Sequence, residues 1–179
     1  MEEAPGELET VRLFVNTLHE NLANEELDSP ETLRVWLKQH GVATGRFRPA
    51  DLRRAREVRE ALRRLMLTNN GAPPEPAAVD LLNQAAARAK LGAALADHSS
   101  WRLEPGRDGI DRSLGELLAI VFRSMSDGTW QRLKACGNPE CEYAFYDHSK
   151  NHSGRWCKME VCGNIAKAKA FRERKRRGA

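Results

Sequence analysis

The chain has no long hydrophobic run, few aromatic residues and no cysteine in its first 135 positions. Its longest unbroken apolar stretch, residues 117–122, is far shorter than the roughly 20 residues that cross a bilayer, so we expect no transmembrane helix and no membrane partner. The first seven residues include three glutamates, whereas a secretion signal begins with basic residues and an apolar stretch. The sequence therefore predicts a cytoplasmic protein.

Motifs of the common enzyme classes are missing as well. The chain has no Gly-rich phosphate loop, no H-E-x-x-H metal motif and no G-x-S-x-G nucleophile turn, and its five histidines are scattered. We therefore predict no catalytic residues and no enzyme.

The length and composition of the chain suit a small folded protein. Its 179 residues, 41 % apolar and 30 % charged, suffice for one ordinary domain with a small additional domain, and they should bury a core.

Charge and cysteine usage both change near Trp130. Residues 131–179 hold 12 of the 29 Lys and Arg residues but only 5 of the 25 Asp and Glu residues, a net charge of +7, which leaves −3 for residues 1–130. All four cysteines lie in the same C-terminal part. These two signals predict one domain over residues 1–130 and a second over residues 131–179.

The N-terminal domain is expected to be mainly helical. Apolar residues recur there every three or four positions, which is the spacing of a buried helical face. This periodicity predicts five helices, at residues 7–22, 30–40, 52–69, 76–90 and 114–127. Ser29 is the expected N-cap of the second helix. Short apolar pieces at 93–95 and 101–103 predict a small β-hairpin between the last two helices.

Asn16 and Thr17 are the candidate ligand-binding residues of the helical domain. They lie beside the apolar stripe of the first predicted helix, where a polar pair could line a pocket between helices. The alternatives are hydrogen bonding between helices or plain surface exposure. Because the domain is negatively charged, we expect it not to contact DNA but to sense an unidentified small ligand or to form a homodimer.

The four cysteines are the candidate metal ligands. Their spacing is C-x4-C-x15-C-x4-C, with the ligands Cys136, Cys141, Cys157 and Cys162. Two such pairs can turn four thiolates toward one point, as tetrahedral zinc requires. A complete thiolate shell leaves no position for a reactive water, so we predict one structural zinc ion per chain.

Alternatives to this ligand set stay open at the level of sequence. The cysteines could form two disulfides, or His148 or His152 could replace one thiolate. The Gly-Asn pairs that follow Cys136 and Cys162 tolerate left-handed backbone angles, so they predict turns whose N–H groups point at a thiolate.

The C-terminal part resembles the CGNR zinc-finger family. The resemblance rests on Cys136–Cys141 (CGNPEC), Tyr146–Asn151 (YDHSKN), Arg155–Cys157 (RWC) and Cys162–Asn164 (CGN), in this order. The N-terminal part is similar to the ABATE domain that usually precedes this finger, through the segments FVNTL at 14–18 and LRVWL at 33–37.

The resemblance implies a bacterial, stress-induced transcription regulator whose finger binds DNA. It also implies a strand after the first cysteine pair and a basic helix after the second. The chain departs from the family at Ile165, where the fourth letter of the CGNR motif calls for arginine. Lys167 or Lys169 could replace a phosphate contact there, but lysine cannot reproduce the bidentate contact of arginine with guanine.

A C-terminal basic helix is the predicted DNA-binding element. Residues after Asn164 are strong helix formers and largely cationic, and an α-helix fits the major groove of B-DNA. The candidate contacts to double-stranded DNA are Lys150, Arg155, Lys167, Lys169, Arg172, Arg174, Lys175 and Arg176. We therefore expect a zinc finger of a short β-hairpin and a basic helix. The alternatives are a solvated tail or a protein-interaction module for an acidic partner.

Overall fold

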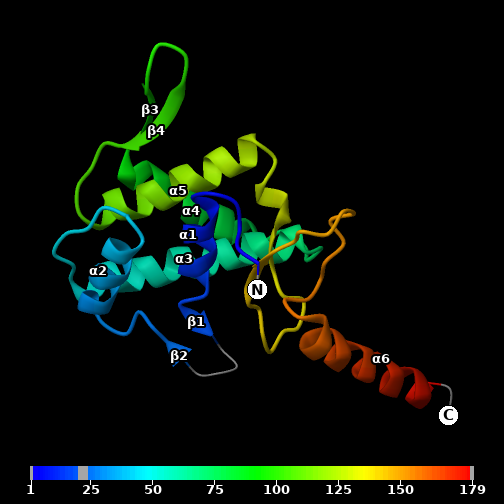
Figure 1. Cartoon of the computed structure of the whole chain (residues 1–179). Coiled ribbons are helices and arrows are strands. Elements are labelled where there is room, and N and C mark those ends of the chain that lie inside the picture. Colours follow the sequence, from blue (N-terminus) through cyan, green and yellow to red (C-terminus); the bar gives the residue numbers. More distant parts are fainter. Residues whose placement is uncertain (1, 20–23, 178–179) are drawn as a thin grey trace.

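The computed structural model describes residues 2–19 and 24–177, and it is mainly α-helical, as predicted (Figure 1). The body is built from the helices α1 (Leu8–Val15), α2 (Pro30–Gln39), α3 (Pro49–Asn69), α4 (Pro76–Ala89) and α5 (Ile110–Ser126). A last helix, α6 (Asn164–Arg177), points away from this body (Figure 1). In the part of the chain that is described, no helix combines the length and the apolar character that a membrane crossing needs.

In the described ranges, short strands form three separate antiparallel pairs. These are β1 (Leu18–His19) with β2 (Asn24–Glu25), β3 (Leu91–Leu95) with β4 (Trp101–Pro105), and β5 (Leu133–Ala135) with β6 (Ala144–Tyr146). The β3–β4 pair confirms the predicted hairpin, with Ala93 opposite Leu103, and it projects from the body (Figure 1). A 3-10 turn, η2 (Trp130–Arg132), precedes β5, and a π-helical turn, η3 (Met159–Gly163), precedes α6.

The second helix begins as its sequence indicates. Ser29 is the N-cap of α2: its hydroxyl accepts a hydrogen bond from Thr32 N at 3.1 Å, and Ser29 N donates to Thr32 Oγ1 at 3.0 Å. This reciprocal pair satisfies two backbone donors that the first turn would otherwise leave open. The helix ends just before Gly41, whose φ of 70° no helix can continue.

The first helix is shorter than predicted. It ends at Val15, whereas the apolar periodicity suggested residues 7–22, of which 20–22 lie outside the described residues. The physical reason is that Arg63 takes the carbonyl groups that further helical turns would use: its Nη2 donates to Val15 O at 2.7 Å and to Leu18 O at 3.2 Å. The chain then leaves the helix and forms β1.

The fifth helix buries only part of its apolar face. Leu114, Leu117 and Val121 are buried in the core, as the spacing predicts, whereas Phe122 and Met125 are exposed. The apolar spacing therefore predicts the buried face correctly over the first three turns of α5, but not at its C-terminal end.

One hydrophobic core joins the helical part and the C-terminal part. It contains Phe14 and Met66 from the helices together with Trp130, Leu133 and Ala144 around the third strand pair. Because these side chains lie in the same contact cluster, the β5–β6 hairpin packs directly on the helical body.

Polar side chains of the helical body bind the backbone of the C-terminal part. Asn16 donates to Ala144 O at 2.9 Å and accepts from Ala144 N at 2.8 Å, so it pairs with β6 as a neighbouring strand would. Asn69 Nδ2 donates to the carbonyl groups of Trp130 and Leu133, both at 2.8 Å. Asn70 Nδ2 donates to Ala135 O at 2.7 Å and to Arg155 O at 2.9 Å.

We expect Asn16→Ala to lower the free energy of unfolding by about 2 kcal/mol, because two hydrogen bonds are lost and a buried edge of β6 is left unpaired. Urea denaturation followed by circular dichroism measures this change. Asn83→Ala, at an exposed position of α4, is the matched control and should cost much less. Equal losses in the two variants would contradict the role of Asn16.

Candidate metal centre

The four cysteines converge on one point, as their spacing predicts. Their Sγ atoms all lie within 4.8 Å of one another, and none of them forms a disulfide. Cys157 Sγ lies 3.6 Å from Cys141 Sγ and 3.8 Å from Cys162 Sγ. Sulfur atoms bound tetrahedrally at about 2.3 Å from a zinc ion are about 3.8 Å apart, so the observed spacing fits such a site.

Each cysteine is placed by a different local element. Cys136 directly follows β5, and its N–H donates to Tyr143 O at 2.9 Å, which extends the hairpin by one residue. Cys162 lies in η3, and Asn138 Nδ2 lies 3.8 Å from its sulfur as a donor. Three of the four cysteines are buried, and Cys157 is partly exposed. The hairpin and the π-helical turn thus bring the two pairs together.

Hydrogen bonds within the cluster distribute charge unevenly among the thiols. The neighbouring thiols of Cys141 and Cys157 lower the pKa of Cys136 to about 2. Cys136 in turn raises the pKa of Cys141 to about 12 and, together with Cys141, also raises that of Cys157. Further thiolates would repel the first, and a divalent cation offsets this repulsion. The donor set therefore suits a metal ion.

The glycines next to the cysteines have a different role from the predicted one. Gly137 and Gly163 do not have positive φ angles, and Asn164 has helical angles, so the expected left-handed turns are not formed there. Both glycines are closely packed: a Cβ on Gly163 would displace the flexible Met159 side chain, and one on Gly137 would lie 3.3 Å from Arg155 O. The left-handed residue is Glu142, directly after the second cysteine.

The two histidines between the cysteine pairs lie outside the sulfur cluster. His152 Nε2 accepts a hydrogen bond from Arg132 Nε at 2.8 Å, and His148 Nε2 lies 3.0 Å from Glu3 O. The potential ligand group found among the described residues contains the four cysteines alone.

A buried ion pair, which sequence reasoning missed, closes the loop between β6 and Cys157. Lys134 Nζ donates to Asp147 Oδ2 at 2.7 Å and also to the carbonyl groups of His152 and Gly154. Asp147 accepts two more hydrogen bonds, from Ser149 N and Gly154 N. Burial alone would raise the pKa of Asp147, but these donors outweigh it and hold the pKa well below its usual range. The only sequence feature that indicates this ion pair is the position of Lys134 between two apolar residues of β5.

The candidate DNA-binding residues are exposed. Lys150 and Arg155 lie on the loop that the ion pair closes, and the other six lie along α6. The helix contacts mainly η3, and its apolar residues Ile165 and Phe171 are also exposed. By contrast, Phe145 of β6 is buried.

The candidate ligand-binding residues of the helical part take part in internal hydrogen bonds. Asn16 binds the backbone of β6, as described above, and Thr17 Oγ1 donates to Phe14 O at 2.8 Å. Arg59 Nη1 in turn donates to Thr17 Oγ1 at 3.2 Å. Their role toward a ligand stays a prediction.

A helical body that holds a four-cysteine centre and a projecting cationic helix has the architecture of a zinc-finger type of protein. Residues 132–175 match the model of the CGNR zinc finger. Residues 10–127 match the ABATE family, which is described as "Putative stress-induced transcription regulator". The chain belongs to the ABATE family and carries a CGNR zinc finger, which confirms the resemblance. A comparison with curated proteins gives no match.

We expect the purified chain to hold one metal ion and Cys157→Ser to hold almost none, because a serine hydroxyl is a poor replacement for a thiolate ligand. Mass spectrometry of the metal content after dialysis measures the stoichiometry. Ser153→Ala, in the loop before the second cysteine pair, is the control and should retain the metal. Full metal content in the Cys157→Ser variant would argue against the four-sulfur site.

We expect Asp147→Asn to lower the free energy of unfolding by about 3 kcal/mol, because the Lys134 charge is left buried without its partner. The Asp147 pKa is depressed in the folded state, so its contribution is complete above the unfolded pKa of about 4 and is lost only as the pH falls through the folded value. The difference between the variant and the wild type should therefore stay constant from pH 8 to pH 5.

Chemical denaturation at several pH values in this range tests the expectation. Asp80→Asn, on the exposed side of α4, controls for the loss of one carboxylate. Measurements extended from pH 5 down to pH 2 test the pKa itself: the difference should shrink there, and a difference that stays constant would show that the Asp147 pKa is not depressed.

Proposed function

We propose that the protein is a zinc-dependent, DNA-binding transcription regulator in which α6 enters the major groove of double-stranded DNA. Membership of a family described as transcription regulators supports the regulatory role. The four-sulfur geometry and the match to a zinc finger support zinc as the bound metal, with one ion per chain. When bound, zinc supplies folding free energy to the finger and no reaction chemistry.

The observation that carries this proposal is the exposure of α6. Its described cationic side chains are all exposed, and Glu173 is the one acidic residue of the helix sequence. The exposed cations are Lys167, Lys169, Arg172, Arg174, Lys175 and Arg176. Charges spread around a projecting helix can reach phosphates on both sides of a groove, and each contact releases counterions from DNA.

The loop closed by the Lys134–Asp147 ion pair extends the cationic surface. Lys150 and Arg155 lie on or next to this loop, and both are exposed. Because the ion pair fixes the loop to β5, these two side chains start from a defined backbone rather than from a mobile segment. We assign them to phosphate contacts, which orient the protein without reading sequence.

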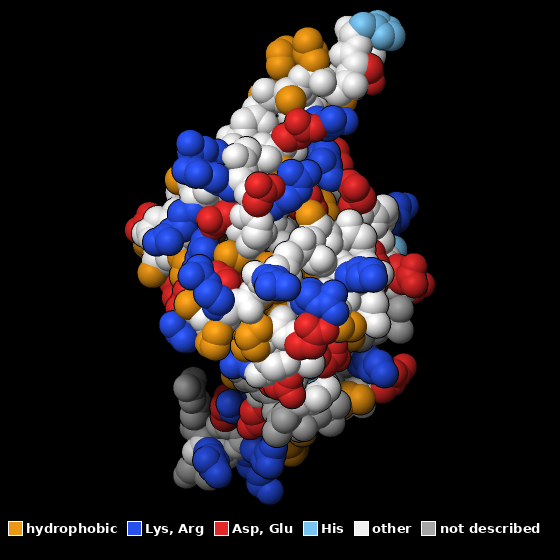
Figure 2. Space-filling model, turned by 90° about the vertical axis from the view of Figure 1, so that its left-hand side faces the viewer, with side chains coloured by type: hydrophobic (Ala, Val, Ile, Leu, Met, Phe, Trp, Pro, Cys, Tyr) orange, Lys and Arg blue, Asp and Glu red, His pale blue; other side chains and the backbone are white. Residues whose placement is uncertain are grey.

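The helical part offers no comparable cationic surface on the face that Figure 2 shows. Positive and negative side chains are interspersed there, so no field of one sign extends over that face. This distribution supports a division of tasks in which the finger binds DNA and the helical part senses a ligand or forms a homodimer. Ile165, which replaces the family arginine, removes one guanidinium from the base of α6.

We expect the zinc-loaded protein to bind random duplex DNA with an affinity that falls linearly with salt on a log–log plot, and chelation to abolish the binding. Each phosphate contact adds about −0.9 to the slope. The triple variant Lys167→Gln, Lys169→Gln, Arg172→Gln should therefore flatten the slope by up to about 2.7. Fluorescence anisotropy of a labelled duplex measures both quantities.

The matched control removes three exposed cations from the helical part, by Lys38→Gln, Arg53→Gln and Arg107→Gln. It changes the net charge equally but should leave the slope almost unchanged. Equal slopes for the two triple variants would refute the role of α6. No binding at low salt would instead favour a protein-interaction module that binds an acidic partner.

A further inference from the structure

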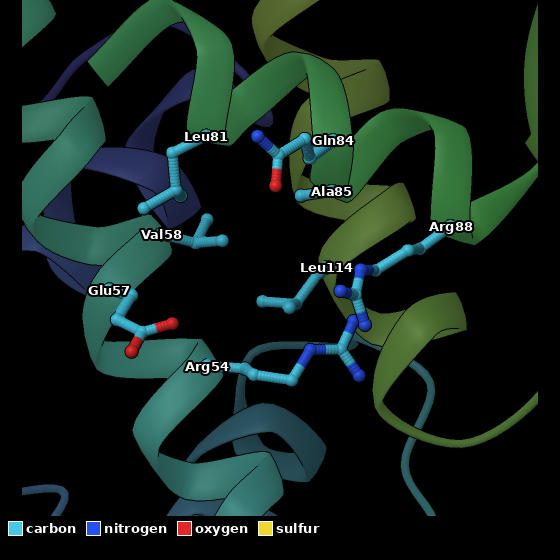
Figure 3. A pocket seen from close by; sticks show the side chains of 8 residues that line it. All are labelled: Arg54, Glu57, Val58, Leu81, Gln84, Ala85, Arg88 and Leu114. Atoms are coloured by element: carbon cyan, nitrogen blue, oxygen red, sulfur yellow. The ribbon is translucent and has the colours of Figure 1, made fainter. Parts of the chain in front are cut away.

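A cavity between three helices of the body combines an apolar floor with a cationic side (Figure 3). Its volume is about 140 Å³. The floor consists of one buried side chain from each helix, Val58 of α3, Ala85 of α4 and Leu114 of α5. A cavity of this size accepts a body of about one benzene ring, as an engineered apolar cavity of about 150 Å³ does.

Two guanidinium groups turn into the cavity from different helices. Arg54 reaches it from α3 and Arg88 from α4, and Figure 3 shows both groups on the same side of the cavity. Arg54 forms an ion pair with Asp111 of α5. For Arg88, no carboxylate lies within 4 Å among the described residues. Asp111 thus pairs with Arg54, whereas Arg88 has no carboxylate partner among the described residues, and an anion can bind beside it between the helices.

The remaining polar groups limit what this anion can be. Figure 3 shows the Glu57 carboxylate across the cavity from the two guanidinium groups, so a second negative charge at the far end of a ligand would be repelled. The apolar floor gives no hydrogen bonds to an inorganic phosphate, but it contributes to the binding of an apolar body. Gln84 also lines the cavity and can accept or donate a hydrogen bond.

We propose that this cavity is a binding site for a small organic monocarboxylate with an apolar body of about one ring. Its carboxylate lies between Arg88 and Arg54, and its apolar body lies on Val58 and Leu114. A charge-assisted contact with a guanidinium that otherwise lacks a partner supplies the affinity, and the floor supplies the selectivity for an organic acid.

The same helix connects this site to the finger. α3 carries Arg54 and Val58 in its N-terminal half and Asn69 and Asn70 at its C-terminal end, where they bind the backbone of the β5–β6 hairpin. A ligand in the cavity is therefore bound by the helix that also supports the finger. Its role as an input signal rests on the proposed regulatory function, but its binding does not depend on DNA.

Titration calorimetry of the full, metal-loaded chain with benzoate tests the proposal without DNA. We expect saturable binding at one site, and about tenfold weaker binding of neutral benzamide, because the charge-assisted contact is lost. Terephthalate, with a second carboxylate facing Glu57, should also bind at least tenfold more weakly, and inorganic phosphate should not compete.

Arg88→Met removes the charge at an exposed position of α4, so the fold should be retained, and it should weaken benzoate binding about tenfold. Arg53→Met, on the exposed face of α3, removes the same charge outside the cavity and should leave the affinity unchanged. The proposal is overturned if benzoate shows no saturable binding, if benzamide binds as tightly, or if the two arginine variants lose the same affinity.

Discussion

Hydrogen bonds from α3 and α1 to the backbone of the β5–β6 hairpin are the interaction on which the metal centre depends. Each strand of this hairpin has three residues, too few to satisfy the backbone groups of the loops around it. Asn69, Asn70 and Asn16 supply the missing partners from the helical body. The finger is consequently folded onto the body, and the direction in which α6 leaves it follows from η3 and the sulfur cluster.

The two halves of α3 serve different sites, and this arrangement limits how the protein can respond to a ligand. The N-terminal half lines the cavity, and the C-terminal end binds the finger backbone. A ligand shifts an equilibrium only by the difference between its affinities for two states. Any response of the finger to the proposed carboxylate therefore requires that α3, or its packing against α4 and α5, differs between a bound and a free state.

Local sequence signals predicted the elements, whereas long-range contacts decided the details that the sequence could not reveal. Helical periodicity and the Ser29 cap act over a few residues, and the cap is confirmed, although α1 ends earlier than its periodicity predicts. The cysteine spacing correctly predicts that four sulfur atoms converge. The early end of α1 depends on Arg63, which lies 48 residues after Val15. No local signal marks Arg63 as buried, because its carbonyl partners come from α1 and from Glu142, far away in the sequence.

The charge of α6 links the order of this helix to its proposed partner. Its cationic side chains repel one another at helical spacings of three and four residues, and the helix contacts mainly η3, so packing elsewhere contributes little to offset this repulsion. The attachment at η3 and the high helix propensity of its residues stabilise it when it is free. When a polyanion such as DNA neutralises these charges, the repulsion within α6 is removed and the helix gains contacts to phosphates. In the proposed complex with DNA, the affinity therefore rises as the ionic strength falls, because the same phosphate contacts that release counterions also remove the repulsion within α6.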